Sequence, residues 1–267
     1  MKVIKMKNLW FILFLISAFS CSQISRKSNP QGFMVGATLW VQNAAEYRAL
    51  SYQAFNLAKL RLNADIQYAT RTKKRAVVVD VDETVLDNSP FQAKLIIEGD
   101  TYNSENWKEW TNQANARALP GAKEFLNWAN KKGVEVFYVT NRKITLFDAT
   151  YKNLKEAGFP IKKENLLMKT TKKTKEPRRK QILAKHHIVL LMGDTLGDFA
   201  EIFDGKPLDA RATLVDTQKN QWGKKFIVLP NPLYGDWEWA LYNNDYKISP
   251  NGKQKAWEKH LYPEPLN

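Results

Sequence analysis

The stretch Ala76-Val77-Val78-Val79-Asp80-Val81-Asp82-Glu83-Thr84-Val85-Leu86-Asp87-Asn88 decides the fold. It begins with a short apolar run, which is typical of a buried strand in a parallel sheet. Asp80 and Asp82 follow the run directly. Residues two apart on an extended chain point to the same side. Both carboxylates should therefore leave the strand together, at the end where open α/β sheets bind ligands.

Two carboxylates this close repel each other, so one must be neutralised or a cation must lie nearby. Mg²⁺ is the natural candidate, because it takes carboxylate and carbonyl oxygens and keeps waters for a phosphate. The alternative is a strand that runs into an acidic turn and a capped helix, with no metal. The stretch alone leaves both interpretations open.

The composition is that of an ordinary globular protein, with 267 residues, 44% hydrophobic and 25% charged. The single cysteine, Cys21, excludes an internal disulfide. A net charge of +14 favours anionic partners: nucleic acid, a membrane surface or small phosphates. The charge is scattered apart from a basic stretch at 169–180, and no zinc-finger or basic-zipper spacing occurs. We therefore expect no stable nucleic-acid partner.

Residues 1–20 have the pattern of an export signal, with three lysines before an apolar core at 9–16 that is too short to span a bilayer. Small residues lead to Cys21, a position that resembles a bacterial lipobox. We expect lipid modification of Cys21 and an exported protein of the bacterial cell envelope, anchored in the outer membrane. The alternative is an ordinary secretory signal with an incidental cysteine.

Further along, strands alternate with helices. Apolar runs at 134–140 and 187–192 predict strands, and 213–215 and 226–229 predict two shorter ones. Helical spacing appears from Gly36, around Trp107 and Trp110, at 121–132 and at 146–157. This alternation is typical of a parallel sheet with right-handed crossovers.

The carboxyl ends of these strands carry the polar residues. In a parallel sheet they share one edge, where the basic stretch would also lie. The residues gathered there would be Asp80, Asp82, Thr140, Asp194 and Asp198. Carboxylates in that number need a divalent cation, and a hydroxyl and a lysine beside it suit a phosphate. The chain has no P-loop and no Gly-x-Ser-x-Gly nucleophile elbow.

These motifs resemble the haloacid-dehalogenase superfamily of phosphatases, and more narrowly the class C bacterial acid phosphatases of the lipoprotein e family. The signature Asp-x-Asp-Glu-Thr, followed by Leu and Asn, occurs at 80–88, and Gly-Asp-x-Leu-x-Asp-Phe occurs at 193–199. Phe91 and Val81 depart from the usual Tyr and Ile or Leu. The resemblance implies an α/β fold: a Rossmann-like core with a parallel sheet flanked by helices, plus a small, mainly helical cap.

On this basis we expect five segments. They are a signal peptide at 1–20, a tether at 21–34, N-terminal cap helices at 35–73, the phosphatase core at 74–230 and a C-terminal cap segment at 231–267.

The resemblance also implies roles. Asp80 matches the nucleophile that forms an aspartyl phosphate, and Asp82 the general acid that later becomes the base for water. Thr140 matches the hydroxyl that holds the phosphoryl group. The Mg²⁺ ligands would be Asp80, the backbone carbonyl of Asp82 and Asp194, with Asp198 supporting them.

The family also places a lysine of the basic stretch on the phosphate. Lys175, in Thr174-Lys175-Glu176-Pro177-Arg178, fits the motif best, while Lys169 and Lys172 remain rivals.

Relatives hydrolyse phosphomonoesters and often favour nucleotides, with the base held between aromatic rings. Trp107 and Tyr234 match those aromatics, although both could instead belong to the core, and Asn141 lies beside Thr140 as a further substrate contact. The resemblance thus implies a Mg²⁺-dependent acid phosphatase, a nucleotidase for nucleoside 5'-monophosphates and related small phosphomonoesters, that forms a homodimer. The alternatives are a catalytically degenerate surface or storage protein on the same scaffold, and a basic surface protein that binds nucleic acid.

Overall fold

A five-stranded parallel sheet forms the centre of the protein in the computed structural model, which describes residues 31–261. The strand order is β5-β4-β1-β6-β7. The strands are β1 (Lys74–Val79), β4 (Glu135–Lys143), β5 (Leu166–Lys169), β6 (His186–Gly193) and β7 (Phe226–Val228). A small antiparallel ribbon pairs β2 (Leu86–Asp87) with β3 (Arg117–Ala118). The predicted α/β architecture with a parallel sheet is confirmed.

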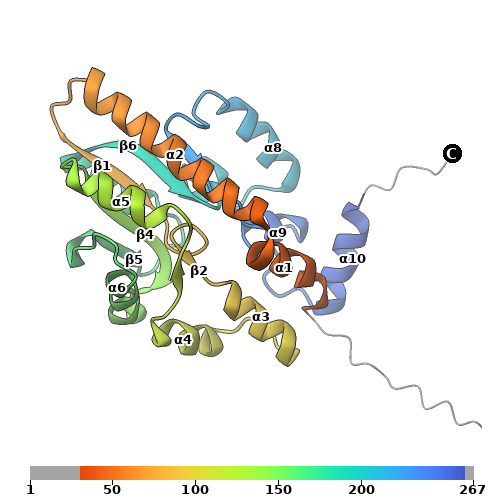
Figure 1. Ribbon diagram of the computed structural model, residues 1–267. Coiled ribbons are helices and arrows are strands. Elements are labelled where there is room, and N and C mark those ends of the chain that lie inside the picture. Colours follow the sequence, from red (N-terminus) through yellow and green to blue (C-terminus); the bar gives the residue numbers. More distant parts are fainter. Residues whose placement is uncertain (1–30, 262–267) are drawn as a thin grey trace, which may run out of the picture.

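Helices flank this sheet and extend beyond it (Figure 1). Within the described residues they are α1 (Val35–Asn43), α2 (Ala45–Tyr68), α3 (Ser89–Glu98), α4 (Ser104–Gln113), α5 (Ala122–Lys131), α6 (Phe147–Glu156), α7 (Glu176–Lys185), α8 (Leu208–Thr217), α9 (Asp236–Leu241) and α10 (Pro250–His260). None of the helices in residues 31–261 combines the length and apolar character needed to cross a membrane.

The apolar run of β1 is continuous because both faces of the sheet are covered. Val77 and Val79 belong to a buried cluster with residues of α2 and α5. Ala76 and Val78 belong to a second cluster on the opposite face, with Ile182 of α7. Neighbouring residues of a strand point to opposite faces, so a central strand covered on both sides needs an apolar residue at every position.

Helix α2 differs from our expectation. We placed residues 35–73 in the cap, but α2 covers one face of the sheet and packs on α5, β6 and β7. Phe55, Ala58 and Leu62 of α2 are buried in the cluster that contains Val77. Their three- and four-residue spacing forms one apolar stripe along the helix, and the sheet buries this stripe. The segment boundaries near residues 73 and 230 stay a prediction.

One predicted strand was wrong, and one strand was not predicted. Residues 213–215 lie inside α8 rather than in a strand, since the surrounding Leu208–Thr217 contains good helix formers that outweigh three β-prone residues. Strand β5 was missed, because its Leu-Leu-Met core is short and lacks β-branched residues.

Helices from the two ends of the described chain lie at one side of the molecule (Figure 1). Helix α1 contacts α3, and α9 contacts α10 and α8. Figure 1 shows α1, α9 and α10 at the same side of the molecule. The rings of Phe33 and Trp257 lie 3.7 Å apart, so the two ends of the described chain meet there. The helical cap built from N- and C-terminal segments stays a prediction. The predicted signal peptide and Cys21 lie outside the described residues.

Leu62→Ala tests the packing of α2 on the sheet. Leu62 is fully buried, whereas Leu60 on the same helix is 62% exposed. We expect Leu62→Ala to lower the free energy of unfolding by about 2–5 kcal/mol, because it leaves a cavity. The matched control Leu60→Ala should change it by no more than about 0.5 kcal/mol. Urea denaturation followed by circular dichroism measures both, and equal effects would contradict the placement of α2.

Candidate active site

The carboxyl ends of β1, β4 and β6 lie side by side, because β1 pairs with both of the other strands. Asp80 continues β1, and its backbone N–H donates to the carbonyl of Met192 in β6 at 2.9 Å. Asp194 follows β6 directly. One carboxylate oxygen each from Asp80, Asp194 and Asp198 lies within 4.8 Å of the others. The sheet thus brings together three of the acidic residues that the sequence placed at this edge.

Lys175 is a cation that faces this cluster. Its ammonium forms ion pairs with Asp80 and Asp198, and its side chain is buried. Burial raises the pKa of Asp80, Lys175 lowers it, and the charges of Asp198 and Asp82 raise it, so that the pKa is about 7. Burial, followed by the charges of Asp198 and Asp80, raises the pKa of Asp194 well above its usual range. One ammonium does not offset three carboxylates, so the cluster favours a further cation.

The donor set fits a hard divalent cation, which prefers carboxylate oxygens. Asp194 is held from both sides: Thr84 Oγ1 donates to its Oδ1 at 3.0 Å, and Asn231 Nδ2 donates to its Oδ2 at 2.8 Å. Such partners orient a ligand and are typical of metal sites. Neither Thr84 nor Asn231 was among the predicted site residues, although Thr84 lies within the first signature.

Asp198 is fixed by its own turn. Its Oδ2 accepts hydrogen bonds from the N–H of Thr195 at 3.0 Å and from the hydroxyl of Thr195 at 3.2 Å. Arg179 donates to its backbone carbonyl at 2.9 Å. Gly193 leaves the necessary room, since a Cβ at this position would lie 2.2 Å from Asp198 Oδ2. Glycine is therefore required at the first position of the second signature, because the Asp198 side chain lies too close for any Cβ there.

The segment after β1 turns back tightly. The N–H groups of Val85 and Leu86 both donate to the carbonyl of Val81, at 3.0 and 2.9 Å. This turn brings Thr84, which is fully buried, against Asp194. The first signature therefore supports the residue that begins the second one.

Glu83 occupies the strained point of this turn, with φ of 54° in the left-handed region. Its buried carboxylate accepts the N–H of Asn88 at 2.8 Å and the hydroxyl of Tyr234. Burial, then the charges of Asp82 and Asp194, raise its pKa well above the usual range. Tyr234 thus ties the C-terminal segment to the first signature.

Asp82 points into a different network from Asp80. Arg142 donates to Asp82 Oδ1 through Nε at 3.0 Å and through Nη2 at 2.7 Å, and Asn88 Nδ2 donates to the same oxygen at 2.9 Å. Asp82 Oδ2 is the more open oxygen, with Arg142 Nε at 3.2 Å. Arg142 is itself buried, and its backbone N–H donates to Thr140 Oγ1 at 3.0 Å. Arg142 was not among the predicted site residues, although its two-residue spacing from Thr140 places both on one side of a strand.

The lysine rivals are separated by their burial. Lys175 is buried against Asp80, Lys172 is exposed, and Lys169 is half-buried at the end of β5. Arg178, in the same motif as Lys175, donates to Asn141 Oδ1 at 2.7 Å. Asn141 is therefore held at this edge by a basic residue. The roles of Lys175 and Asn141 toward substrate stay predictions.

The two predicted aromatic residues contact different members of this network. Trp107 is half-buried, its ring centroid lies 5.2 Å from that of Phe91, and the Arg142 guanidinium carbon lies 5.5 Å from its centroid. Tyr234 is half-buried and binds Glu83 through its hydroxyl. Both pack against the core as well as bordering the site.

Gly193→Ala tests the close approach at Asp198. The added methyl group would displace the Asp198 carboxylate, so we expect divalent-cation affinity to fall by about 10–100-fold, as for other lost supports of metal ligands. Calorimetric titration with Mg²⁺ or Mn²⁺ measures this. Gly36→Ala is the matched control, because a Cβ there would meet nothing within 4 Å. Unchanged affinity in Gly193→Ala would contradict the assignment.

Comparison with known proteins places the chain in a family. A model of the HAD superfamily, subfamily IIIB (acid phosphatase), matches residues 17–237. The class C acid phosphatase from Bacillus anthracis is similar, with 44% identity and a TM-score of 0.85 over 88% of this chain and 99% of that one. Its structure with tungstate bound gives 44% identity and a TM-score of 0.83, over 88% and 98% of the two chains.

A curated plant protein, the stem 31 kDa glycoprotein of Glycine max, is 25% identical over 164 residues, or 59% of this chain. The chain spans 58% of the length of that relative. The family match covers most of the chain, and it includes every residue of the carboxylate cluster. The chain therefore belongs to subfamily IIIB of the HAD superfamily, the acid phosphatases, which are phosphomonoester hydrolases.

Proposed function

We propose that the protein is an exported, Mg²⁺-dependent acid phosphatase that cleaves small phosphomonoesters through an aspartyl-phosphate intermediate. The observation that carries this proposal is the cluster of Asp80, Asp194 and Asp198 beside the buried Lys175. A bound Mg²⁺ would be held by these carboxylates, and it would offset the negative charge of nucleophile and phosphate as they approach.

The chain's own residues provide the two covalent steps. An Asp80 oxygen attacks phosphorus, the bond from phosphorus to the ester oxygen breaks, and the leaving alcohol takes a proton from Asp82. Water then attacks the phosphorus of the aspartyl phosphate, Asp82 takes the proton, and inorganic phosphate leaves with Asp80 restored. Asp82 Oδ2, the less contacted oxygen, is the one that carries this proton. Thr140 and Lys175 hold the phosphoryl oxygens during both steps.

Arg142 positions Asp82 for this transfer. It fixes Asp82 Oδ1 through two donors and is itself buried, so the side chain cannot turn freely. The same guanidinium carbon lies 5.5 Å from the Trp107 ring. The Arg142 side chain therefore contacts both Asp82, the proposed acid and base, and the ring of Trp107.

Nucleotides are the substrates we favour. Trp107 and Tyr234 are half-buried rings in contact with residues of the site, and Asn141 accepts a hydrogen bond from Arg178 of the basic stretch. Stacking a base on an aromatic ring contributes roughly 1–3 kcal/mol and depends little on which base it is. One similar solved enzyme has tungstate bound. Tungstate is a tetrahedral oxyanion like phosphate, and we expect it to compete with substrate here.

Phosphate release from nucleoside 5'-monophosphates, with and without EDTA, tests the proposal. Release that stops with EDTA and returns with Mg²⁺ supports it. A degenerate storage protein or a nucleic-acid-binding protein would release no phosphate under either condition, and release that persists after complete metal removal would contradict the role of the cation.

Asp80→Asn removes the attacking oxygen while keeping the side chain's shape. We expect turnover to fall by at least about a thousandfold, as for other lost nucleophiles. Asp148→Asn, an exposed carboxylate on α6, is the control and should keep normal turnover. The assay is initial-rate phosphate release at saturating Mg²⁺. Full turnover in Asp80→Asn would disprove the nucleophile assignment.

We also propose that a lipid on Cys21 anchors the enzyme at the outer membrane, and that it acts there as a homodimer. Expression with radiolabelled palmitate should label the wild-type protein and leave Cys21→Ser unlabelled. The reason is that the acyl chains attach through this only cysteine. Labelling that survives in Cys21→Ser, or no label in either protein, would remove the anchor.

A further inference from the structure

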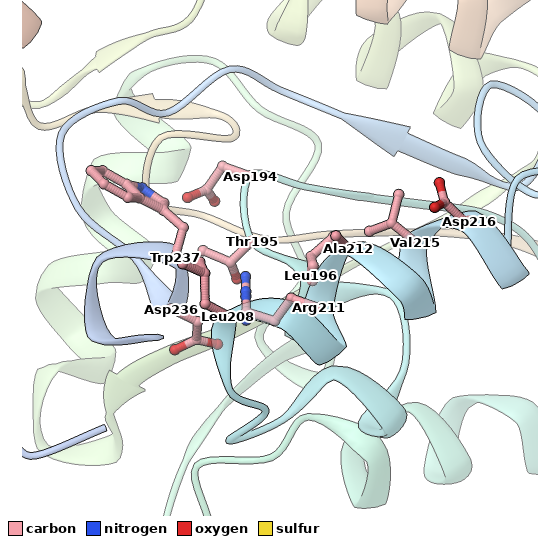
Figure 2. A pocket seen from close by; sticks show the side chains of 10 residues that line it. All are labelled: Asp194, Thr195, Leu196, Leu208, Arg211, Ala212, Val215, Asp216, Asp236 and Trp237. Atoms are coloured by element: carbon pink, nitrogen blue, oxygen red, sulfur yellow. The ribbon is translucent and has the colours of Figure 1, made fainter. Parts of the chain in front are cut away.

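A pocket of about 450 Å³ adjoins the carboxylate cluster. Its walls come from three places: the turn Asp194–Leu196, helix α8 and the start of α9 (Figure 2). This volume lies in the range of small-molecule sites, about 300–1,000 Å³. Asp194 belongs both to this pocket and to the metal cluster, so the two spaces share a wall.

Arg211 of α8 is the unexplained residue of this pocket. Its side chain is only 8% exposed, and among residues 31–261 no hydrogen bond or ion pair reaches its guanidinium. The charge that acts on it is Asp236, which is itself paired with Lys173 at 2.8 Å. Burial lowers the pKa of Arg211 and Asp236 opposes this, although an arginine stays charged in either case. A buried unpaired cation is costly unless an anion pairs with it.

The rest of the pocket suits an organic group. Leu208, Ala212 and Val215 line it from α8, and Trp237 lies across from them with 38% of its surface exposed (Figure 2). Asp216 also lines the pocket, but it is exposed to solvent. Asp194 and Asp236 line it too; Asp194 belongs to the carboxylate cluster, and Asp236 is paired with Lys173. Arg211 is therefore the cation of this lining that a ligand would meet.

Gly235 fixes the position of Trp237. Its φ of 145° is one that other residues rarely adopt, and a Cβ there would lie 3.3 Å from Thr195 Cγ2 and from Trp237 Cδ1. The indole is thus held beside the turn that carries Asp194 and Thr195.

We propose that Arg211 binds a second acidic group of the substrate, a phosphate or a carboxylate, while the scissile phosphate lies at the carboxylate cluster. The guanidinium offers the two parallel donors that match either oxyanion, and Trp237 with the apolar wall of α8 contacts the organic part between them. This inference rests on the proposed phosphatase function. It assigns to the enzyme a preference for phosphomonoesters that carry a second anionic group.

The test compares kcat/KM for two pairs of substrates. In the first pair, adenosine 3',5'-bisphosphate carries one phosphate more than adenosine 5'-monophosphate. In the second pair, O-phosphoserine carries a carboxylate that phosphoethanolamine lacks. Product chromatography follows loss of the 5'-phosphate in the first pair. We expect the wild type to prefer the more anionic member of at least one pair. Arg211→Gln should reduce that preference at least about tenfold, which corresponds to about 1.4 kcal/mol, and Arg211→Lys should restore part of it.

Two further variants keep the test decisive. Arg61→Gln, an exposed arginine on α2, is the charge-matched control and should keep the preference. If Arg211→Gln fails to fold, the exposed Ala212→Asp places a like charge beside the ligand and should lower the preference in the same direction. A preference absent in the wild type, or unchanged in these pocket variants, would overturn the inference while monophosphate turnover continues. If the wild type hydrolyses no member of either pair, the proposed function itself fails.

Discussion

Repulsion among buried carboxylates at one edge of the sheet is the constraint on which the site depends. Asp80, Asp194 and Asp198 converge within 4.8 Å, in a place where burial already raises the pKa of Asp80 and Asp194. The fold tolerates this because Lys175 is buried against two of them and because the three together form a site for a divalent cation. In the proposed mechanism, a cation bound at these carboxylates would offset the charge of the anionic nucleophile and of the anionic phosphate as they approach each other.

The sheet and its turns make that convergence unavoidable. Strand β1 is fixed by neighbours on both sides, so Asp80 cannot move away from Asp194 without breaking the ladder. Gly193 permits Asp198 to approach β6, and Thr84 connects the turn after β1 to Asp194. Segments far apart in the sequence are joined through these short contacts. The segment after β7 takes part as well, because the hydroxyl of Tyr234 donates to Glu83 in the left-handed turn.

The sequence predicted those features that follow from strand geometry. The apolar run ending in Asp80, and the polar ends of the next strands, were sufficient to place the carboxylates at one edge. Residues whose role depends on a partner from another element could not be found in this way. Arg142 is the clearest case, because its role is to hold the carboxylate of Asp82, which is 60 residues away in the sequence. Helix α2 was misplaced because an apolar stripe shows that a helix is buried, but not which surface covers it. Strand β5 and helix α8 were misassigned because short segments carry weak periodicity.

The most direct measurement is anomalous X-ray scattering from crystals of the wild-type protein soaked in Mn²⁺, a substitute for Mg²⁺ that gives a strong signal. The account predicts one dominant anomalous peak with carboxylate oxygens of Asp80 and Asp194 in its first coordination sphere and Asp198 next to it. The peak should vanish in crystals of Asp194→Asn. Two results would contradict the claim that this sheet edge is a divalent-cation site. One is a dominant peak elsewhere on the protein, and the other is the absence of a peak between well-ordered Asp80 and Asp194 side chains at saturating Mn²⁺.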